Sequence, residues 1–393
     1  MRFASKILVV LLAAALAACD AGAANVGDAE KAKVDAIAEA WIKAGKTPGM
    51  VVGIAQDGKM LYAKAYGAAD LERNIPMAPD SILLIGSITK QFTAAAMMQL
   101  VEQGKVSLSD PISKYFPEFP RGNEVTIRHV LNHTSGMFNY TSHEMPDETK
   151  WRQDYTTDAM VKRIASYMPA YDFEPGTAWR YSNSGFFIAG AIIEKVTGEP
   201  LRAYLQKNVI EKAGLSADTA LDDDEREVLP RRAEGYDPVK DKPGSYIKAD
   251  FIDMSVPGGA GAMRSTVTDL AIWQHALFTN KVVSAKSVAE MTTPGKLKDG
   301  KLSSTNIFRT PGAPAPPARR DPPSTYALGL SVGTTGGHKA ITHTGGIQGF
   351  NCYVGTFPDD HLTVVVLTNT SNGGGVAREI VESLLKIESE AQP

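Results

Sequence analysis

Cysteine is scarce in this sequence, and neither sign of charge dominates. Cys19 and Cys352 are the only cysteines among 393 residues, so a small fold held together by several disulfides is excluded. The formal net charge is −3 at pH 7 and no stripe of Lys and Arg is present, so nucleic-acid binding has no electrostatic support. Hydrophobic residues make up 43% of the chain, which is enough to build a large core.

Long apolar runs are also lacking, apart from a short one at the N-terminus. Arg2 and Lys6 precede an apolar run at residues 7–18. This run is too short to span a bilayer, and its basic flank is typical of a secretory signal. The sequence therefore predicts a signal peptide over residues 1–18 and an exported protein of the periplasm or cell envelope.

The apolar run ends in the letters LAAC, which resemble a bacterial lipobox. Cleavage there would leave a lipidated Cys19 at the new N-terminus. The alternative is ordinary cleavage after the small residues Ala23 or Ala24. Residues 19–32 are small and polar, so we expect them to form a tether. The lipid anchor would then be the only contact with a membrane.

Strand-like patterns lie near both ends of the chain. Residues 49–67 hold two apolar runs around Asp57-Gly58, a dipeptide that favours a tight hairpin turn. Residues 350–369 repeat the pattern around a Pro-Asp-Asp turn. Cys352 lies in the first of these later runs, where an unpaired cysteine behaves as a small buried hydrophobe.

Helical patterns occupy the middle and the C-terminus. Residues 158–168 and 184–198 are helix-like, and the segment after residue 375 repeats apolar residues on one helical face. We therefore predict an α+β fold over residues 33–388. Its antiparallel sheet combines strands from both chain ends and is flanked by helices, and a mostly helical subdomain is inserted at about residues 110–255.

Two further segments read as irregular. The acidic run at residues 222–227 is typical of a solvated turn. The Pro-rich stretch at residues 310–323 cannot form regular structure, so we expect a loop.

A serine and a lysine stand three residues apart at the start of an apolar helical run. Ser87 lies where unpaired backbone N–H groups and the helix dipole favour an oxyanion. Lys90 would share its helix face, and burial would lower the pKa of its amine. Such an amine can take the serine proton and create a nucleophile. The structural alternative is a capping serine beside a lysine that reaches solvent.

The pattern Ser-x-x-Lys is weak alone, because it also occurs at residues 245–248 and 383–386. The first copy has no helical run behind it, and the second falls late in the C-terminal helix. A Gly-x-Ser-x-Gly pattern places Ser331 between glycines, but a nucleophile elbow needs a strand, a sharp turn and a helix. Here the stretch is typical of strand, Gly-rich turn and strand. Ser87 is therefore the predicted nucleophile.

Two other short patterns carry candidate chemistry. Tyr181 and Asn183 form the only Tyr-x-Asn in the chain, and these side chains can shuttle protons and bind a substrate amide. His343 is followed by Thr344 and a pair of glycines near a strand end, where a ligand can approach the backbone closely. Each pattern alone is equally compatible with an ordinary loop.

The order Ser-x-x-Lys, Tyr-x-Asn, His-Thr-Gly makes the chain resemble the serine β-lactamase and penicillin-binding-protein superfamily. The branch it resembles holds class C β-lactamases, low-mass DD-carboxypeptidases, esterases and D-aminopeptidases. The stretches at residues 108–119, 131–137 and 257–271 look like the same family, so the resemblance covers about residues 33–388.

The resemblance implies a role at each matching position. Ser87 would be the acylated nucleophile, with Lys90 and Tyr181 as a coupled pair for proton transfer. The identity of the acylation base is disputed in this superfamily, so it stays open between these two. The substrate would be bound by Asn183, His343, Thr344 and Gly345, and the backbone N–H groups of Ser87 and Gly346 would form the oxyanion hole.

One position departs from class C β-lactamases, which have lysine where this chain has His343. A histidine is charged only part of the time at neutral pH, so it would hold a substrate carboxylate less firmly. We therefore expect weak β-lactam hydrolysis, and activity on carboxylate substrates that falls as pH rises through the histidine pKa.

The function predicted is that of a secreted serine hydrolase acting on D-alanyl peptides or small esters, without a cofactor or metal. The alternatives are a β-lactamase and a non-catalytic penicillin-binding sensor. A zinc enzyme is the rival class, because His129 and His133 are four residues apart. No His-Glu-x-x-His motif or cysteine cluster accompanies them. Oligomeric state is not predicted.

Overall fold

A computed structural model of the chain describes residues 26–142, 151–223, 226–309 and 324–387. The predicted signal peptide, Cys19, the alternative cleavage sites and the Pro-rich stretch at residues 310–323 lie outside these residues. Within the described residues, no helix is long and apolar enough to cross a bilayer.

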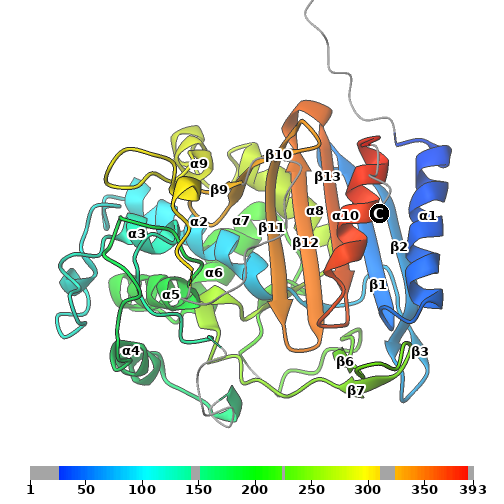
Figure 1. Cartoon of the computed structure of the whole chain (residues 1–393), viewed down its shortest axis with the longest axis horizontal. Coiled ribbons are helices and arrows are strands. Elements are labelled where there is room, and N and C mark those ends of the chain that lie inside the picture. Colours follow the sequence, from blue (N-terminus) through cyan, green and yellow to red (C-terminus); the bar gives the residue numbers. More distant parts are fainter. Residues whose placement is uncertain (1–25, 143–150, 224–225, 310–323, 388–393) are drawn as a thin grey trace, which may run out of the picture.

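The frame is one antiparallel sheet of eight strands, drawn from both ends of the chain (Figure 1). This confirms the predicted pairing of the terminal hairpins. In spatial order, its strands are β3 (Ile75–Pro76), β2 (Lys59–Asp70), β1 (Gly49–Gln56), β13 (Leu362–Thr368), β12 (Phe350–Phe357), β11 (His338–Ile347), β10 (Ser331–Thr335) and β9 (Thr325–Tyr326).

The neighbouring strands β1 and β13 are covered on both faces. Their sequences GMVVGIAQ and LTVVVLT are nearly continuous apolar runs, as expected for strands with no solvent face. Val52 and Val366 face a core beneath α1 (Asp28–Lys43) and α10 (Gly374–Leu384). Val51 and Leu367 face the second, larger core. The sheet is therefore the boundary between two hydrophobic layers.

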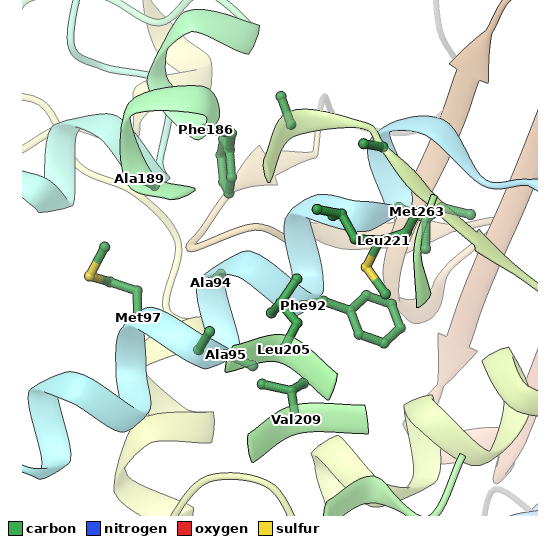
Figure 2. Packing of buried hydrophobic residues seen from close by; sticks show 14 of the residues in the cluster. Phe92, Ala94, Ala95, Met97, Phe186, Ala189, Leu205, Val209, Leu221 and Met263 are labelled. Carbon is green, nitrogen blue, oxygen red and sulfur yellow. The ribbon is translucent and has the colours of Figure 1, made fainter. Parts of the chain in front are cut away.

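The larger core is built around α2 (Thr89–Glu102), whose residues 89–100 are all buried. Figure 2 shows Phe92, Ala94, Ala95 and Met97 of this helix among side chains from several other segments. These segments include α5 (Asn183–Thr197), α6 (Leu201–Leu205), β5 (Ala220–Leu221) and β8 (Met263–Ser265). Phe92 stacks on Trp273 of α8 (Val267–Phe278) at 4.0 Å between ring centroids. This packing immobilises the residues at the start of α2.

The remaining elements lie around this core on the helical side of the molecule, except for the hairpin of residues 236–248, which lies near β3 at the edge of the sheet (Figure 1). They are β4 (Leu83–Leu84), α3 (Ile127–Leu131), α4 (Thr157–Ala165), α7 (Glu211–Ala213), β6 (Tyr236–Pro238), β7 (Tyr246–Lys248) and α9 (Ala285–Thr292). The larger core runs from Val51 to Leu367 without a break between the sheet and the insertion, so the two share one core.

The structure tests three local predictions, for the N-terminal tether, the acidic run and Cys352. The predicted tether over residues 19–32 is too long, because α1 begins at Asp28 and Val26 is buried against the sheet core. The acidic run is not simply solvated, since Asp222 is 5% exposed and its carboxylate pairs with Arg264 at 2.6 Å. Cys352 is free and buried, as predicted.

Candidate active site

Ser87 lies in a single 3-10 turn, Gly86–Ile88, immediately before α2. The helix start leaves backbone N–H groups without helical partners, which favours negative charge beside the serine. Ser87 is partly exposed and lines a cavity of about 780 Å³. A small molecule can therefore reach its hydroxyl.

Lys90 is completely buried one turn further along the chain. Its Nζ lies 3.0 Å from Ser87 Oγ, 2.7 Å from Asn183 Oδ1 and 2.7 Å from the Ala260 carbonyl oxygen. These partners are uncharged, and burial holds the pKa of Lys90 well below its usual range.

A neutral amine has two hydrogens and one lone pair. The carbonyl oxygens of Asn183 and Ala260 accept the two hydrogens of Lys90. The lone pair is then left for the Ser87 hydroxyl, which can donate its proton along the 3.0 Å contact. The arrangement is that of a base beside a nucleophile.

Tyr181 lies close to both Ser87 and Lys90. Burial raises the pKa of its phenol, although a hydrogen bond to Ser87 acts in the opposite direction. Its ring centroid lies 4.8 Å from Lys90 Nζ. Tyr181 is therefore a protonated phenol next to the nucleophile, and it can pass a proton to a departing group.

Asn183 begins α5 and lines the cavity. Its Oδ1 accepts from Lys90, and its Nδ2 donates to Thr141 Oγ1 at 2.7 Å. Both ends of its amide are thus engaged in the structure. Asn183 positions the lysine amine, and binding of a substrate amide would require its Nδ2 to leave Thr141.

The strand segment at residues 343–346 approaches the serine turn through its glycines. A Cβ on Gly345 would lie 1.9 Å from the Ile85 carbonyl oxygen. Gly86, at φ +49°, faces the backbone of Gly346, and a Cβ there would meet it at 2.9–3.0 Å. Only glycine permits this approach. It places the exposed Gly346 beside the Ser87 turn, as an oxyanion hole requires.

The position of His343 does not fit the expected role of binding a substrate carboxylate. It is 5% exposed and does not line the cavity. Its Nε2 lies 2.7 Å from the Tyr326 hydroxyl and its Nδ1 lies 2.6 Å from the Thr344 carbonyl oxygen. Burial, the largest cause, lowers its pKa to about 3, so the imidazole is neutral across physiological pH.

His133 was missed as a site residue, although it lies in one of the family-like stretches. Its ring centroid is 4.3 Å from those of both Tyr181 and Tyr326, and its Nδ1 accepts from the backbone N–H of Ser182 at 3.2 Å. His133 has φ +63°, a left-handed conformation that is costly for a residue with a side chain. The imidazole therefore fixes the backbone between Tyr181 and Asn183.

The two histidines of the zinc hypothesis serve other purposes. His129 accepts from the backbone N–H of Thr126 at 3.3 Å in the cap of α3. His133 packs against Tyr181, as above. Among the residues the structure describes, no group of three or more His, Cys, Asp and Glu side chains is placed to hold a metal ion.

The walls of the cavity come from segments that carry no sequence motif. Arg152 is the only cationic side chain among its described lining residues, and it pairs with Asp250 at 2.9 Å. Asp237 accepts from the Ser371 hydroxyl. The aromatic side chains of the wall are Tyr140, Trp151, Phe251 and Phe350. No local pattern identifies these residues, because they meet only in the folded chain.

The competing serine patterns lie elsewhere. Ser331 begins strand β10, which is followed by a turn and β11, so it lacks the elbow geometry. Lys248 ends strand β7, and Ser383 lies in the last turn of α10. Only Ser87 combines a helix start with a buried lysine.

Comparison with known proteins places this geometry in a family. The family model described as "Beta-lactamase" matches residues 32–386. The putative penicillin-binding protein PbpX of Bacillus subtilis (strain 168) is 31% identical over 243 residues, which cover 62% of this chain and 58% of that protein. Esterase EstB of Burkholderia gladioli is 32% identical over 247 residues, which cover 59% of this chain and 60% of the esterase. The chain thus spans about three fifths of the length of both relatives.

A solved structure supports the same assignment. The octameric penicillin-binding protein homologue from Pyrococcus abyssi aligns over 91% of this chain and 77% of its own, with a TM-score of 0.75 and 28% identity. The α+β fold predicted from the resemblance is therefore confirmed. With a family model that matches nearly the whole described chain, the protein belongs to the Beta-lactamase family, within the superfamily of serine β-lactamases and penicillin-binding proteins.

Proposed function

We propose that the protein is a hydrolase that cleaves ester or amide bonds through an acyl-enzyme on Ser87. The observation that carries the proposal is the 3.0 Å contact between Ser87 Oγ and the fully buried Lys90 amine. In acylation, Lys90 takes the serine proton while the serine oxygen attacks the carbonyl carbon. The oxyanion lies toward the N–H groups of Ser87 and Gly346.

Collapse of the tetrahedral intermediate expels the alcohol or amine of the substrate. The proton that this leaving group needs comes from Lys90, passed on through the Tyr181 hydroxyl beside the serine. Water then attacks the acyl-enzyme, with the neutral Lys90–Tyr181 pair accepting its proton. Ser87 is regenerated when the carboxylic acid leaves.

The favoured substrates are small esters without a carboxylate next to the scissile bond. His343 is buried and neutral, and Arg152 is already paired with Asp250, so the site offers no unpaired cation among its described residues. The esterase among the relatives supports this choice. D-alanyl peptides are the second candidate, because a penicillin-binding protein is also among the relatives and Thr344 presents an exposed side chain beside the site.

The test is steady-state hydrolysis of p-nitrophenyl acetate, combined with intact mass after exposure to benzylpenicillin. Wild type should hydrolyse the ester, Ser87→Ala should not, and Ser331→Ala should behave as wild type. A persistent penicilloyl adduct with little ester turnover would favour the D-alanyl peptidase. Consumption of the drug would favour a β-lactamase, and slow loss of an adduct without any turnover would favour a sensor.

We further propose that the chain is exported and carries a lipid on Cys19. The basic residues, apolar run and cysteine at the N-terminus support this proposal. Membrane fractionation of the full chain, beside Cys19→Ala, tests it. The wild type should sediment with membranes and the variant should be released; membrane association of the variant would contradict lipidation.

A further inference from the structure

A second cavity of about 430 Å³ adjoins the first. Five described residues line both: Asp250, Phe251, Ile252, Gln348 and Phe350. Phe251 is 50% exposed, so its ring is accessible to a ligand along this shared wall. The shared wall makes the two cavities one path leading away from Ser87.

The first cavity lies on the acyl side of the serine. A leaving group must sit beside Tyr181, because this residue delivers its proton. The residues that line the cavity include Ser87, Asn183 and Gly346, but not Tyr181 or His343. The cavity therefore receives the part of the substrate that stays bonded to Ser87, and the second cavity continues it.

The second cavity offers no free charge. Its charged lining residues number three acids and three bases, and each has an ion-pair partner. Asp222 binds Arg232 and Arg264, and Lys248 binds Glu72. Its remaining wall is largely apolar, formed by Ile82, Leu83, Leu84, Ala233, Ala249, Phe251, Ile252, Met254 and Phe350. An uncharged, apolar chain suits this lining, because it disturbs none of the ion pairs.

We propose that the acyl portion of the substrate passes Phe251 and Phe350 and ends in the second cavity, so that the enzyme prefers elongated, uncharged acyl chains to acetyl. This inference rests on the proposed acyl-enzyme function. The chain would bury methylene groups between the apolar wall residues of the second cavity, and the preference would appear in kcat/KM, since burial lowers the energy of the transition state relative to free enzyme and substrate.

The experiment measures kcat/KM for p-nitrophenyl esters of acetic, butyric, hexanoic and octanoic acids with the purified protein. A fully buried methylene is worth about fourfold. Because the chain would be only partly buried in the second cavity, we expect kcat/KM for the octanoyl ester to exceed that for the acetyl ester by about tenfold or more. A flat or falling profile in the wild type would overturn the proposal without any variant.

Two variants locate the effect. Ala249 lines only the second cavity, so Ala249→Phe should fill it and reduce the octanoyl-to-acetyl ratio at least fivefold. Ser245→Phe adds the same side chain to the exposed turn before β7, lines neither cavity and should leave the ratio unchanged. An unchanged ratio in a folded Ala249→Phe protein, checked by thermal unfolding, would overturn the proposal. Absence of any Ser87-dependent ester hydrolysis would instead overturn the proposed function.

Discussion

The surroundings of Ser87 differ in exposure between its two sides. On one side, the hydroxyl faces a cavity of about 780 Å³ with a mixed aromatic and charged wall. On the other, Lys90, His133 and His343 are each at most 5% exposed and lie near the buried Tyr326 and the partly buried Tyr181. The open side admits a substrate, while the buried side excludes water from the base.

This difference explains how a lysine can act as a base near neutral pH. Water would stabilise the protonated amine, so the amine must be removed from water to lose its proton. The buried side supplies that environment and also holds two histidines in their neutral forms. Substrate selection is left to the open side, where the aromatic wall residues Tyr140, Trp151, Phe251 and Phe350 take no part in the proton transfer.

The strongest test of this contrast is Lys90→Met. Without the amine, Ser87 loses the base that lies 3.0 Å from its Oγ, and we expect kcat/KM for an ester to fall by about 10³-fold. Lys386→Met, at the exposed end of the C-terminal Ser-x-x-Lys pattern, is the matched control and should retain activity. The wild type should lose activity in acid as Lys90 is protonated. A Lys90→Met protein with near-normal activity would refute the assigned base.

A second test separates the two adjacent glycines. Gly345→Ala places a Cβ 1.9 Å from the Ile85 carbonyl oxygen, so the strand must move away from the Ser87 turn. We expect the free energy of unfolding to fall by about 2–3 kcal/mol and kcat to fall by about 10²-fold. Gly346→Ala has open space around its new Cβ and should unfold at nearly the wild-type temperature. Equal free energies of unfolding for the two variants would contradict the prediction, because they would show that the strand accommodates a Cβ at residue 345 without cost.

The third test concerns His133 on the buried side. His133→Phe keeps a ring against Tyr181 but removes the acceptor of the Ser182 N–H. We expect a loss of about 1–3 kcal/mol in the free energy of unfolding and a fall of roughly tenfold in kcat. His133→Asn tolerates the left-handed backbone but lacks the full ring, which separates the two contributions. Undiminished kcat in both variants would leave His133 with a purely structural role.

The smallest effect concerns His343 and pH. Its pKa is lowered to about 3, so its charge should not change between pH 6 and 8. The rate ratio between carboxylate-bearing and neutral esters should therefore stay flat over that range, in place of the fall expected from the sequence. A rate ratio that falls as pH rises would contradict this prediction and would indicate that His343 is charged in the lower part of the range.

The same histidine should make the fold sensitive to acid. An unfolded histidine binds a proton below about pH 6.5, whereas the folded His343 does so only near pH 3, so stability is lost as pH falls through this window. At pH 5 the loss amounts to about 2 kcal/mol. His343→Gln, compared with the wild type by denaturant unfolding at pH 7 and pH 5, should show a weaker pH dependence.

The sequence predicted what depends on near neighbours along the chain. The hairpin at residues 49–67 follows from two apolar runs on either side of Asp57-Gly58, and β1 and β2 confirm it. The contact between Ser87 and Lys90 follows from a three-residue spacing on a helix. The composition of the acidic run, by contrast, predicted a solvated turn. This prediction failed for Asp222 because its partner, Arg264, is distant in the sequence.

The sequence by itself thus determined the α+β fold class and the contact between Ser87 and Lys90, because periodicity and spacing are local properties of the chain. Only the tertiary structure decided the protonation of His343, the role of His133 and the walls of both cavities. Burial and hydrogen bonding depend on segments that are distant in sequence, and those segments meet only when the insertion packs against the sheet.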